Sequence, residues 1–303
     1  MLHLRVTVPA DRAVALRDEL ARHPAVAHVA HLPGASVLPA GDLLLCDVAR
    51  EGAHEVVEWL QDQATHHDGA IAVDDIDTVI SDAAAVAEAA MPGYGTDAVV
   101  WEQIEARARD EAVLTPSLLV LMAVATMIAG VGILLDSPIL VVGAMVVGPE
   151  YGPLASLCVA AVRRRWTGVR VAGGTLLGAI AVGVVTTWVL TLALRGTNLA
   201  PDGYDLTDRQ LTAFIAHPDA LAAVVAVLAG VAGMLALTEA RSGTLVGVLV
   251  SVTTIPAVAN IGVAAAYGAT SEMIGAAAQL GVNLTGLVLA GVLTLAVQSR
   301  LTT

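Results

Sequence analysis

The segment from Ile139 to Val162 is apolar and long enough to cross a membrane, yet it is interrupted near its middle. The interruption contains Gly148, Pro149, Glu150, Gly152 and Pro153. Proline removes a backbone N–H and glycine weakens a helix, so this segment predicts two half-helices joined by a break. A bilayer cannot satisfy free backbone groups or an unpaired carboxylate, so protein or a water-filled cavity must cover such a break. We therefore interpret the segment as the working site of a polytopic membrane protein.

Six apolar segments predict six membrane spans in the second part of the chain. They are Leu118–Leu135, Pro138–Val162, Val169–Leu194, Ala220–Thr238, Thr244–Tyr267 and Met273–Val297. At 1.5 Å per residue, each segment is long enough to cross the roughly 30 Å hydrocarbon core. Glu150 is the only acidic residue within these segments, which makes its position the main functional question.

The first 80 residues predict a small soluble domain. Alternating apolar positions predict strands at Leu2–Val8, Val26–Leu32, Leu43–Val48 and Ala70–Val79, and helices follow the first and third strands. This βαββαβ order is the ferredoxin-like pattern. We expect an α+β chain with a soluble domain at 1–80, a linker and interfacial helix at 81–116, and an all-α transmembrane domain at 117–303.

The charge of the chain is confined to its first part. The net charge of −13 arises before Ser117, because acidic residues and arginines are equal in number after it. An acidic domain does not favour nucleic acid as a partner. We expect this domain to regulate the membrane domain or to form a homo-oligomer, with a dimer favoured.

Arginine placement predicts the orientation in the membrane. Arg163–Arg165 follow the second span, Arg241 precedes the fifth, and Arg300 follows the sixth. In a six-span arrangement these residues share one side, so both termini are expected to be cytoplasmic in a cell (inner) membrane. The acidic loop Arg195–Asp219 falls on the opposite side.

The histidines and cysteines are not spaced as metal or cofactor ligands usually are. All histidines except His217 lie in the soluble domain, and Cys46 and Cys158 are far apart. A metal site involving His28 and His31 is the alternative, but solvated faces and helix ends explain the histidines more simply. No cofactor or metal is expected.

An internal repeat is visible at a shift of 104 residues. The shift pairs Gly143 with Gly247 and Ser156 with Asn260, and it places the first span on the fourth and the second on the fifth. The fifth span has its own interruption at Ser251–Pro256. Three spans per repeat would place the halves in opposite orientations, and paired broken helices in inverted repeats indicate a midplane binding site.

Candidate ligand-binding residues surround both breaks. They are Gly148, Glu150, Tyr151, Ser251, Thr253, Thr254, Asn260, Gln279 and Asn283, with Pro256 at the second break. Glu150 is interpreted as a proton or cation site, or as an acceptor from a polar solute or a lipid headgroup. The alternatives are that Glu150 caps the second half-helix or faces water. The hydroxyls and amides are alternatively bonds to freed carbonyls or between helices.

Three functions fit these features. A transporter or channel-like protein with a small-solute or ion site at the breaks is favoured. A membrane receptor or scaffold that binds a small molecule or lipid without transport is the second. A membrane-embedded enzyme is the least favoured, because no nucleophile-plus-base pattern, catalytic residue set or phosphate loop is present in the sequence.

The residues around the breaks also carry a family resemblance. Asp136-Ser137-Pro138, Gly143-Ala144-Met145, Pro149, Pro153, Pro256 and Asn283 resemble the bacterial and archaeal membrane family known as domain of unknown function 389. The resemblance extends over about Trp101 to Val297. It implies a polytopic membrane architecture and implies no activity.

Overall fold

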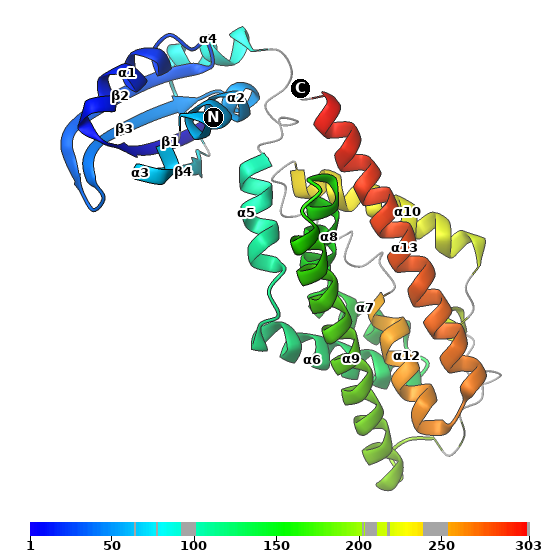
Figure 1. Ribbon diagram of the computed structural model, residues 1–303. Helices are drawn as coiled ribbons and strands as arrows, with labels where there is room; N and C mark the ends of the chain where they lie inside the picture. The colour runs from blue at the N-terminus through cyan, green and yellow to red at the C-terminus, as the bar shows by residue number, and fades with distance from the viewer. Residues whose placement is uncertain are drawn as a thin grey trace. The chain divides into compact units, whose positions relative to one another are not determined.

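The computed structural model describes residues 1–63, 65–76, 78–91, 101–201, 203, 211–216, 219–238 and 254–301. These residues form two compact units, Met1–Ile104 and Glu105–Leu301 (Figure 1). The first unit contains a β-sheet and the second consists of helices. The chain is therefore of mixed α+β class, as the sequence predicts.

The first unit is built on a four-stranded antiparallel sheet. Its strands are β1 (Leu2–Val8), β2 (Val26–Val37), β3 (Ala40–Val48) and β4 (Ala70–Asp75), in the order β2-β3-β1-β4. The helices are α1 (Ala10–Leu20), α2 (Ala53–Asp62), α3 (Thr65–Asp68) and α4 (Asp82–Ala90), with a short 3-10 helix η1 (Arg50–Gly52). Leu2, Leu4, Val6 and Val8 are fully buried, so the alternation in β1 places one face of the sheet on the core.

Strand β2 extends further than the sequence predicts. The Pro33-Gly34 pair suggests a loop after Leu32, but β2 continues to Val37 and pairs with β3 through Val37 and Ala40. A register shift between Leu32 and Ser36 absorbs the proline, and Gly34 takes a φ of 65°. A bulge of this kind lets the ladder continue past residues that cannot pair regularly.

A buried carboxylate fixes this irregular hairpin. Asp42 is 5% exposed, and its Oδ1 accepts a hydrogen bond from the Gly34 backbone N–H at 2.8 Å. Its Oδ2 lies 2.7 Å from Nε2 of His31. The Gly34 N–H, followed by His31, lowers the pKa of Asp42 below its ordinary value of 3.8. Because the ionised form is favoured in the fold, Asp42 stabilises the hairpin above this value, and the stabilisation is lost as the pH falls through the lowered pKa.

Replacing Asp42 by Asn is expected to loosen the hairpin at neutral pH and to remove this acid dependence. Hydrogen–deuterium exchange of peptides that cover β2 and β3 measures the effect. We expect roughly tenfold faster exchange at the Gly34 amide, because a charge-assisted hydrogen bond is lost. Asp18→Asn, at an exposed acid in α1, is the control and should exchange as the wild type does. Equal exchange in the Asp42 variant would contradict the assignment.

The second unit contains nine described helical segments. They are α5 (Trp101–Glu111, which enters it at Glu105), α6 (Pro116–Leu134), α7 (Pro138–Val147), α8 (Tyr151–Val162), α9 (Trp166–Gly196), η3 (Ala213–Ala216), α10 (Ala220–Thr238), α12 (Thr254–Tyr267) and α13 (Thr270–Leu301). Helices α6, α9, α10 and α13 are each long and apolar enough to cross a membrane, and the bent pair α7–α8 counts as one further span. Helix α12 is shorter, and residues 239–253 before it lie outside the described part. Among the described residues, the structure thus gives four spans, or five if the bent pair is one span, and the six spans that the sequence predicts are not confirmed.

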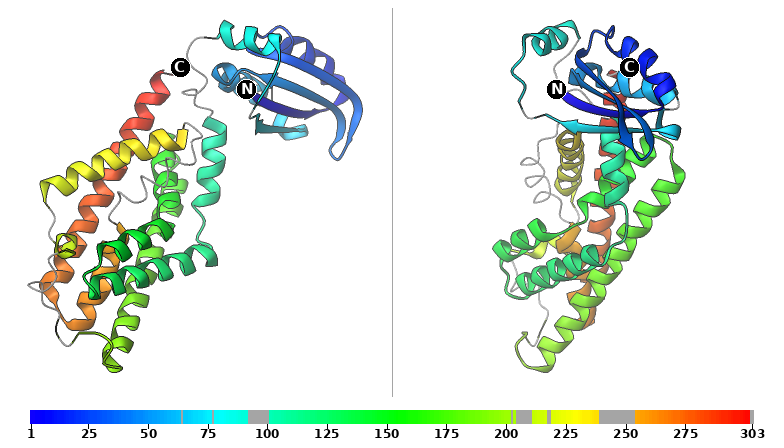
Figure 2. Two further views of the ribbon diagram at one scale, coloured as in Figure 1. Left: turned by 180° about the vertical axis from the view of Figure 1, so that it is seen from behind. Right: turned by 90° about the vertical axis from the view of Figure 1, so that its left-hand side faces the viewer.

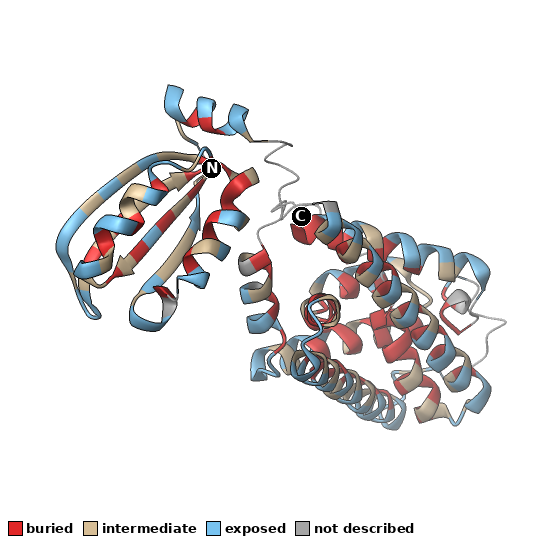
Figure 3. Cartoon of the chain, turned by 45° about the horizontal axis from the view of Figure 1, so that its top comes forward, coloured by how far each residue is buried: buried red, intermediate tan, exposed pale blue. Residues whose placement is uncertain are grey.

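The outward faces of these helices are apolar. Leu177 and Val185 on α9, Leu228 on α10, and Leu289 and Leu293 on α13 are each more than half exposed. Buried residues lie on the inward faces, as the distribution of red and pale blue in Figure 3 shows. An apolar surface of this extent is typical of lipid contact, so the helical unit is consistent with a membrane protein.

Candidate functional site

The break between α7 and α8 is a bend of 55°. Gly148 ends α7 in an extended conformation with a ψ of 131°, and Pro149 and Glu150 lead into α8 at Tyr151. Helix α7 has 10 residues and α8 has 12, so at 1.5 Å per residue they are about 15 and about 18 Å long. In a single span formed by this pair, the break would fall near the middle of roughly 30 Å of hydrocarbon.

The Glu150 carboxylate is buried beside this break. Its side chain points into the unit rather than into water, since the residue is 2% exposed. Glu150 is the N-cap residue of α8, but its carboxylate makes no capping hydrogen bond. The sequence left two alternatives for Glu150, a helix cap and an acid that faces water. The structure supports neither of them.

Thr254 holds one oxygen of this carboxylate. Its hydroxyl donates a hydrogen bond of 2.7 Å to Oε1 of Glu150 from the beginning of α12. Oε2 of Glu150 has no hydrogen-bond partner among the described residues. Burying an ionised carboxylate costs several kcal/mol unless it is compensated. The site therefore has one hydrogen-bonded oxygen and one oxygen that a proton or a small cation would satisfy.

Gly148 is needed for this arrangement. A Cβ atom added at Gly148 would collide with Oε2 of Glu150 and would lie 2.7 Å from Cγ1 of Ile255. The missing side chain at Gly148 leaves room for the carboxylate to fold back along the break while α12 packs against it. Gly148, which the sequence predicts as a ligand-binding residue, thus provides the space for the Glu150 carboxylate.

The other candidates at the second break are placed as follows. Ser251 and Thr253 lie outside the described residues. Pro256 is buried in the first turn of α12, and Asn260 is 3% exposed one turn further along the same helix. Of the hydroxyl residues proposed near Pro256, the structure thus brings Thr254 directly to Glu150.

The side chain of Tyr151 links the break to a neighbouring helix. Its hydroxyl donates a hydrogen bond of 2.5 Å to the backbone carbonyl of Gly233 in α10. The phenol therefore ties the beginning of α8 to α10. It positions the break, and its hydroxyl proton is committed to a backbone acceptor.

Glu111, at the end of α5, lies beside the same half-helix and was not among the residues predicted from sequence. A Cβ atom added at Gly152 would lie 3.0 Å from Oε2 of Glu111. A carboxylate is favourable near the first turn of a helix because of the helix dipole. The sequence pattern carries no signal for this contact, because only the packing of α5 on α8 brings Glu111 close to Gly152.

Gln279 and Asn283 form a second buried polar group on α13. Both are 3% exposed, and Nε2 of Gln279 donates a hydrogen bond of 3.1 Å to Oδ1 of Asn283. Oε1 of Gln279 has no partner among the described residues. The four-residue spacing thus produces a pair on one helix face with an acceptor left available.

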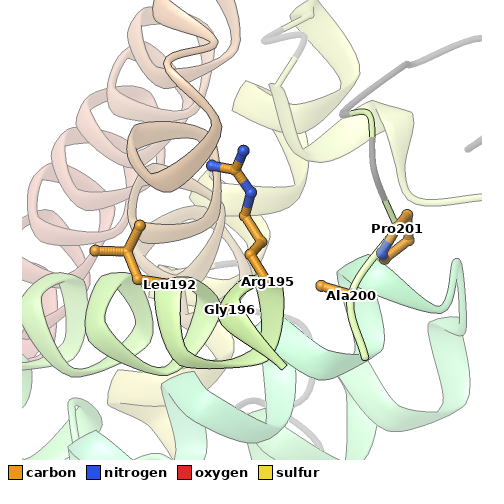
Figure 4. A pocket seen from close by; sticks show the side chains of 5 residues that line it. All are labelled: Leu192, Arg195, Gly196, Ala200 and Pro201. Atoms are coloured by element: carbon orange, nitrogen blue, oxygen red, sulfur yellow. The ribbon is translucent and has the colours of Figure 1, made fainter. Parts of the chain in front are cut away.

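An open pocket of about 270 Å³ lies near the end of α9. Figure 4 shows Arg195 extending from α9 toward the neighbouring helix, with Pro201 across the pocket. The Arg195 guanidinium donates to the carbonyl of Ala266 and lies 4.4 Å from the centroid of the Tyr267 ring. The Tyr267 hydroxyl donates to the carbonyl of Pro201 at 2.6 Å. These contacts join the end of α9 to the end of α12. The residues around the pocket therefore have a structural role, and we assign no ligand to it.

Metal ligands are not gathered anywhere in the part of the chain that the structure describes: no group of three His, Cys, Asp or Glu side chains could hold an ion. His28 and His31, the alternative metal pair, contact different acids, Asp47 and Asp42. Buried Cys46 has its pKa raised to about 12, mainly by burial, which makes it an unreactive thiol at neutral pH.

Comparison with known proteins finds one family match, which lies within the helical unit. Residues 145–289 match the family described as "Domain of unknown function (DUF389)", which confirms the resemblance seen in the sequence. The matched range includes Glu150, Thr254 and Gln279. The family description assigns no activity. No curated protein and no solved structure matches the chain.

Proposed function

We propose that this chain is a membrane transporter or channel-like protein in which Glu150 exchanges a proton or a small cation at the α7–α8 break. The observation that carries the proposal is the buried hydrogen bond between Thr254 and Glu150, with Oε2 of the acid left without a described partner. Intramembrane acids are costly and mark ion or substrate pathways. A proton or cation that binds Oε2 would offset that cost.

We propose that the helical unit contains an inverted repeat of two three-span halves, and the positions of its helices support this proposal. Helices α6 and α10 both have 19 residues and begin 104 positions apart, at Pro116 and Ala220. Helices α9 and α13 begin at the same interval, at Trp166 and Thr270. The segment before α12 lies outside the described residues, so the sixth span is inferred from the sequence and from this repeat.

The turns between spans are also repeated. The Arg165 N–H donates to the Ala160 carbonyl at 2.8 Å, and at an interval of 104 the Ala269 N–H donates to the Ala264 carbonyl at 2.9 Å. In each turn the preceding residue has positive φ, 53° at Arg164 and 70° at Gly268. Similar backbone turns at equivalent positions, where most residues differ, are better evidence of a repeat than matched alanines and valines.

Contacts between the halves are exchanged in the way that two-fold symmetry requires. Cys158 of α8 contacts the carbonyl of Val288 in α13, with Sγ at 3.8 Å. The counterpart of Cys158 is Gly262 of α12, and a Cβ there would lie 2.8 Å from the carbonyl oxygen of Val184 in α9, the counterpart of Val288. Each half thus places its middle helix against the long last helix of the other.

Glu150 and Thr254 are themselves equivalent positions, 104 residues apart in the sequence. Two equivalent residues that touch lie on the pseudo-two-fold axis. In transporters with inverted repeats, the ion and substrate sites lie near the midplane at this interface, where helices are broken. We propose that the Glu150–Thr254 pair lies at such an interface, which its position beside the α7–α8 break supports.

The second polar group extends the proposed site. Ser156 donates to the carbonyl of Ala108 in α5, and Thr175 donates to the carbonyl of Ala112 directly after α5. Their counterparts in the second half are Asn260 and Gln279. The second half therefore carries larger amides where the first half has short hydroxyls that hold α5. We propose that Asn260, Gln279 and Asn283 contact a small polar solute on that side.

The soluble unit is proposed to have the ferredoxin-like topology. Its strand order β2-β3-β1-β4 with antiparallel neighbours supports that assignment. Domains of this kind often pair or bind small ligands, so we propose that it regulates the membrane domain and forms a dimer. The placement of Arg163–Arg165 and Arg300 supports cytoplasmic termini in the cell (inner) membrane.

Proton movement in reconstituted vesicles tests the proposal. Purified full-length protein is placed in vesicles that contain the pH dye pyranine, with a potassium diffusion potential to drive protons inward. Vesicles with protein are expected to acidify faster than protein-free vesicles. The same vesicles are assayed with sodium as the probe. If neither ion moves, transport of protons and sodium is excluded; ion-dependent binding without flux would then favour a receptor.

A further inference from the structure

A cavity of about 340 Å³ lies between α5, α8 and α9, away from the break. Its walls are mainly apolar and include Ala112, Val113, Val159, Ala160 and Val171. Its polar rim includes Glu105, Arg109, Arg163 and Arg165. The volume is within the range of sites for small molecules or parts of larger ones. An apolar wall with a charged rim is the pattern that an amphiphile requires.

The rim carries an excess of positive charge. One oxygen of Glu105 accepts from Nε of Arg163 at 2.5 Å, and the other lies 2.7 Å from Nη1 of Arg165. The Glu105 side chain is 11% exposed, whereas those of Arg163 and Arg165 are 41% and 52% exposed. Among the described residues, Arg109 forms no ion pair. Among the described residues that line the cavity, three guanidinium groups and one carboxylate give the mouth a formal charge of +2.

The neighbouring residues place this mouth at headgroup depth. Arg163 and Arg165 follow directly after the apolar α8, and Trp166 begins α9 with 69% of its surface exposed. Tryptophan and arginine at the end of an apolar span are typical of the membrane–water interface. Val113 and Val171 of the cavity wall are each about half exposed, so the wall is open to the side where acyl chains would lie.

We propose that this cavity binds an anionic phospholipid. The phosphate would lie among Arg109, Arg163 and Arg165, because guanidinium groups bind phosphate oxygens with paired hydrogen bonds. The upper part of one acyl chain would lie against Val113, Val159 and Val171. The cavity is too small for a whole lipid, so the remaining chains stay in the bilayer.

Glu105 sets how strongly the phosphate is held. Its carboxylate already occupies donors on Arg163 and Arg165, and it repels an approaching anion. Removing this negative charge should strengthen binding of an anionic lipid, whereas removing an arginine should weaken it. If the ion pairs only stabilised the fold, removing Glu105 and removing an arginine would both lower the stability of the protein. The two changes would then not shift lipid affinity in opposite directions.

Native mass spectrometry of the full-length protein tests the proposal with phosphatidylglycerol and phosphatidylcholine of identical chains. Each arginine near a membrane surface contributes about fivefold in affinity for anionic lipid, so Arg109→Gln with Arg165→Gln should lower phosphatidylglycerol affinity by about thirtyfold. Glu105→Gln should raise it several-fold. Phosphatidylcholine binding should change little in all variants.

Arg170→Gln and Arg300→Gln are the matched controls, because these arginines are expected on the same membrane side and do not line the cavity. Thermal melting establishes that each variant remains folded. The proposal is overturned if the double arginine variant binds phosphatidylglycerol as the wild type does, or if the controls weaken it equally. It is also overturned if inorganic phosphate alone displaces the lipid, or if Glu105→Gln lowers stability with no gain in phosphatidylglycerol affinity.

Discussion

Replacing Glu150 by Gln is expected to reduce proton-driven acidification of reconstituted vesicles by about tenfold or more, to the level of protein-free vesicles. Gln has the shape of Glu and can still accept the Thr254 hydrogen bond, but it neither takes up nor releases a proton. The fold should therefore be retained while exchange is lost. Pyranine fluorescence measures the rate, and circular dichroism verifies the helical content.

Glu272→Gln is the matched control for this variant. Glu272 is also buried, at 8% exposure, and one of its oxygens has no described partner. It lies in the first turn of α13 and not at a helix break. We expect the control to retain most of the wild-type rate. An equal loss in both variants would assign the effect to general destabilisation and would remove the special role of the break.

Replacing Gly148 by Ala is expected to destabilise the helical unit by about 2 kcal/mol, as overpacking of a filled site usually does. The added Cβ would meet Oε2 of Glu150 and Cγ1 of Ile255, so either α12 moves away or the carboxylate rotates. For a unit of this size, thermal melting should begin about 4 to 8 °C lower. Proton flux should fall as well, since both responses alter the Glu150–Thr254 contact.

Gly143→Ala supplies a control on the same half-helix. No atom lies within 4 Å of a Cβ added at Gly143, and Ala is favoured over Gly inside a helix by about 0.5 to 1 kcal/mol. The melting temperature should stay level or rise slightly. If Gly148→Ala melts as this control does, the close packing of the break against α12 is wrong.

The break itself was predictable from the sequence. Gly148 and Pro149 interrupt an apolar run, and their effect on helices is local. The acid at the same place was equally visible, because charge is rare in such segments. What the sequence could not decide is whether the carboxylate caps α8 or points inward, since that depends on the space that α12 leaves beside Gly148.

The partner of Glu150 was harder to identify. The 104-residue shift places Thr254 opposite Glu150, but Ser251 and Thr253 carry the same chemistry nearby, and alanine and valine dominate the alignment. Hydroxyls at adjacent positions of a helix point in different directions, whereas positions three apart share a face, so the spacing alone does not decide between Thr254 and Ser251. Only the packing of α12 against the break selects Thr254, and Ser251 and Thr253 lie outside the described residues.

Tertiary packing also explains what the sequence missed elsewhere. Glu111 was not among the residues predicted from the sequence, and α5 is held against α8 and α9 by Ser156 and Thr175, which brings that acid beside the first turn of α8. In the soluble unit, Pro33-Gly34 suggested a loop, and the contact of Asp42 with the Gly34 amide keeps the strand pairing instead. Both outcomes depend on residues distant in sequence.

Infrared difference spectroscopy of the protein in lipid most directly tests whether Glu150 is an exchangeable group. The wild type, titrated between acidic and alkaline pH, should show a carboxyl C=O band from a protonated acid in an apolar site. The band should be missing in Glu150→Gln and shifted in Thr254→Val, which removes the hydroxyl donor but keeps the side-chain shape. Identical titration spectra for the wild type and Glu150→Gln would contradict a proton-exchanging role for this residue.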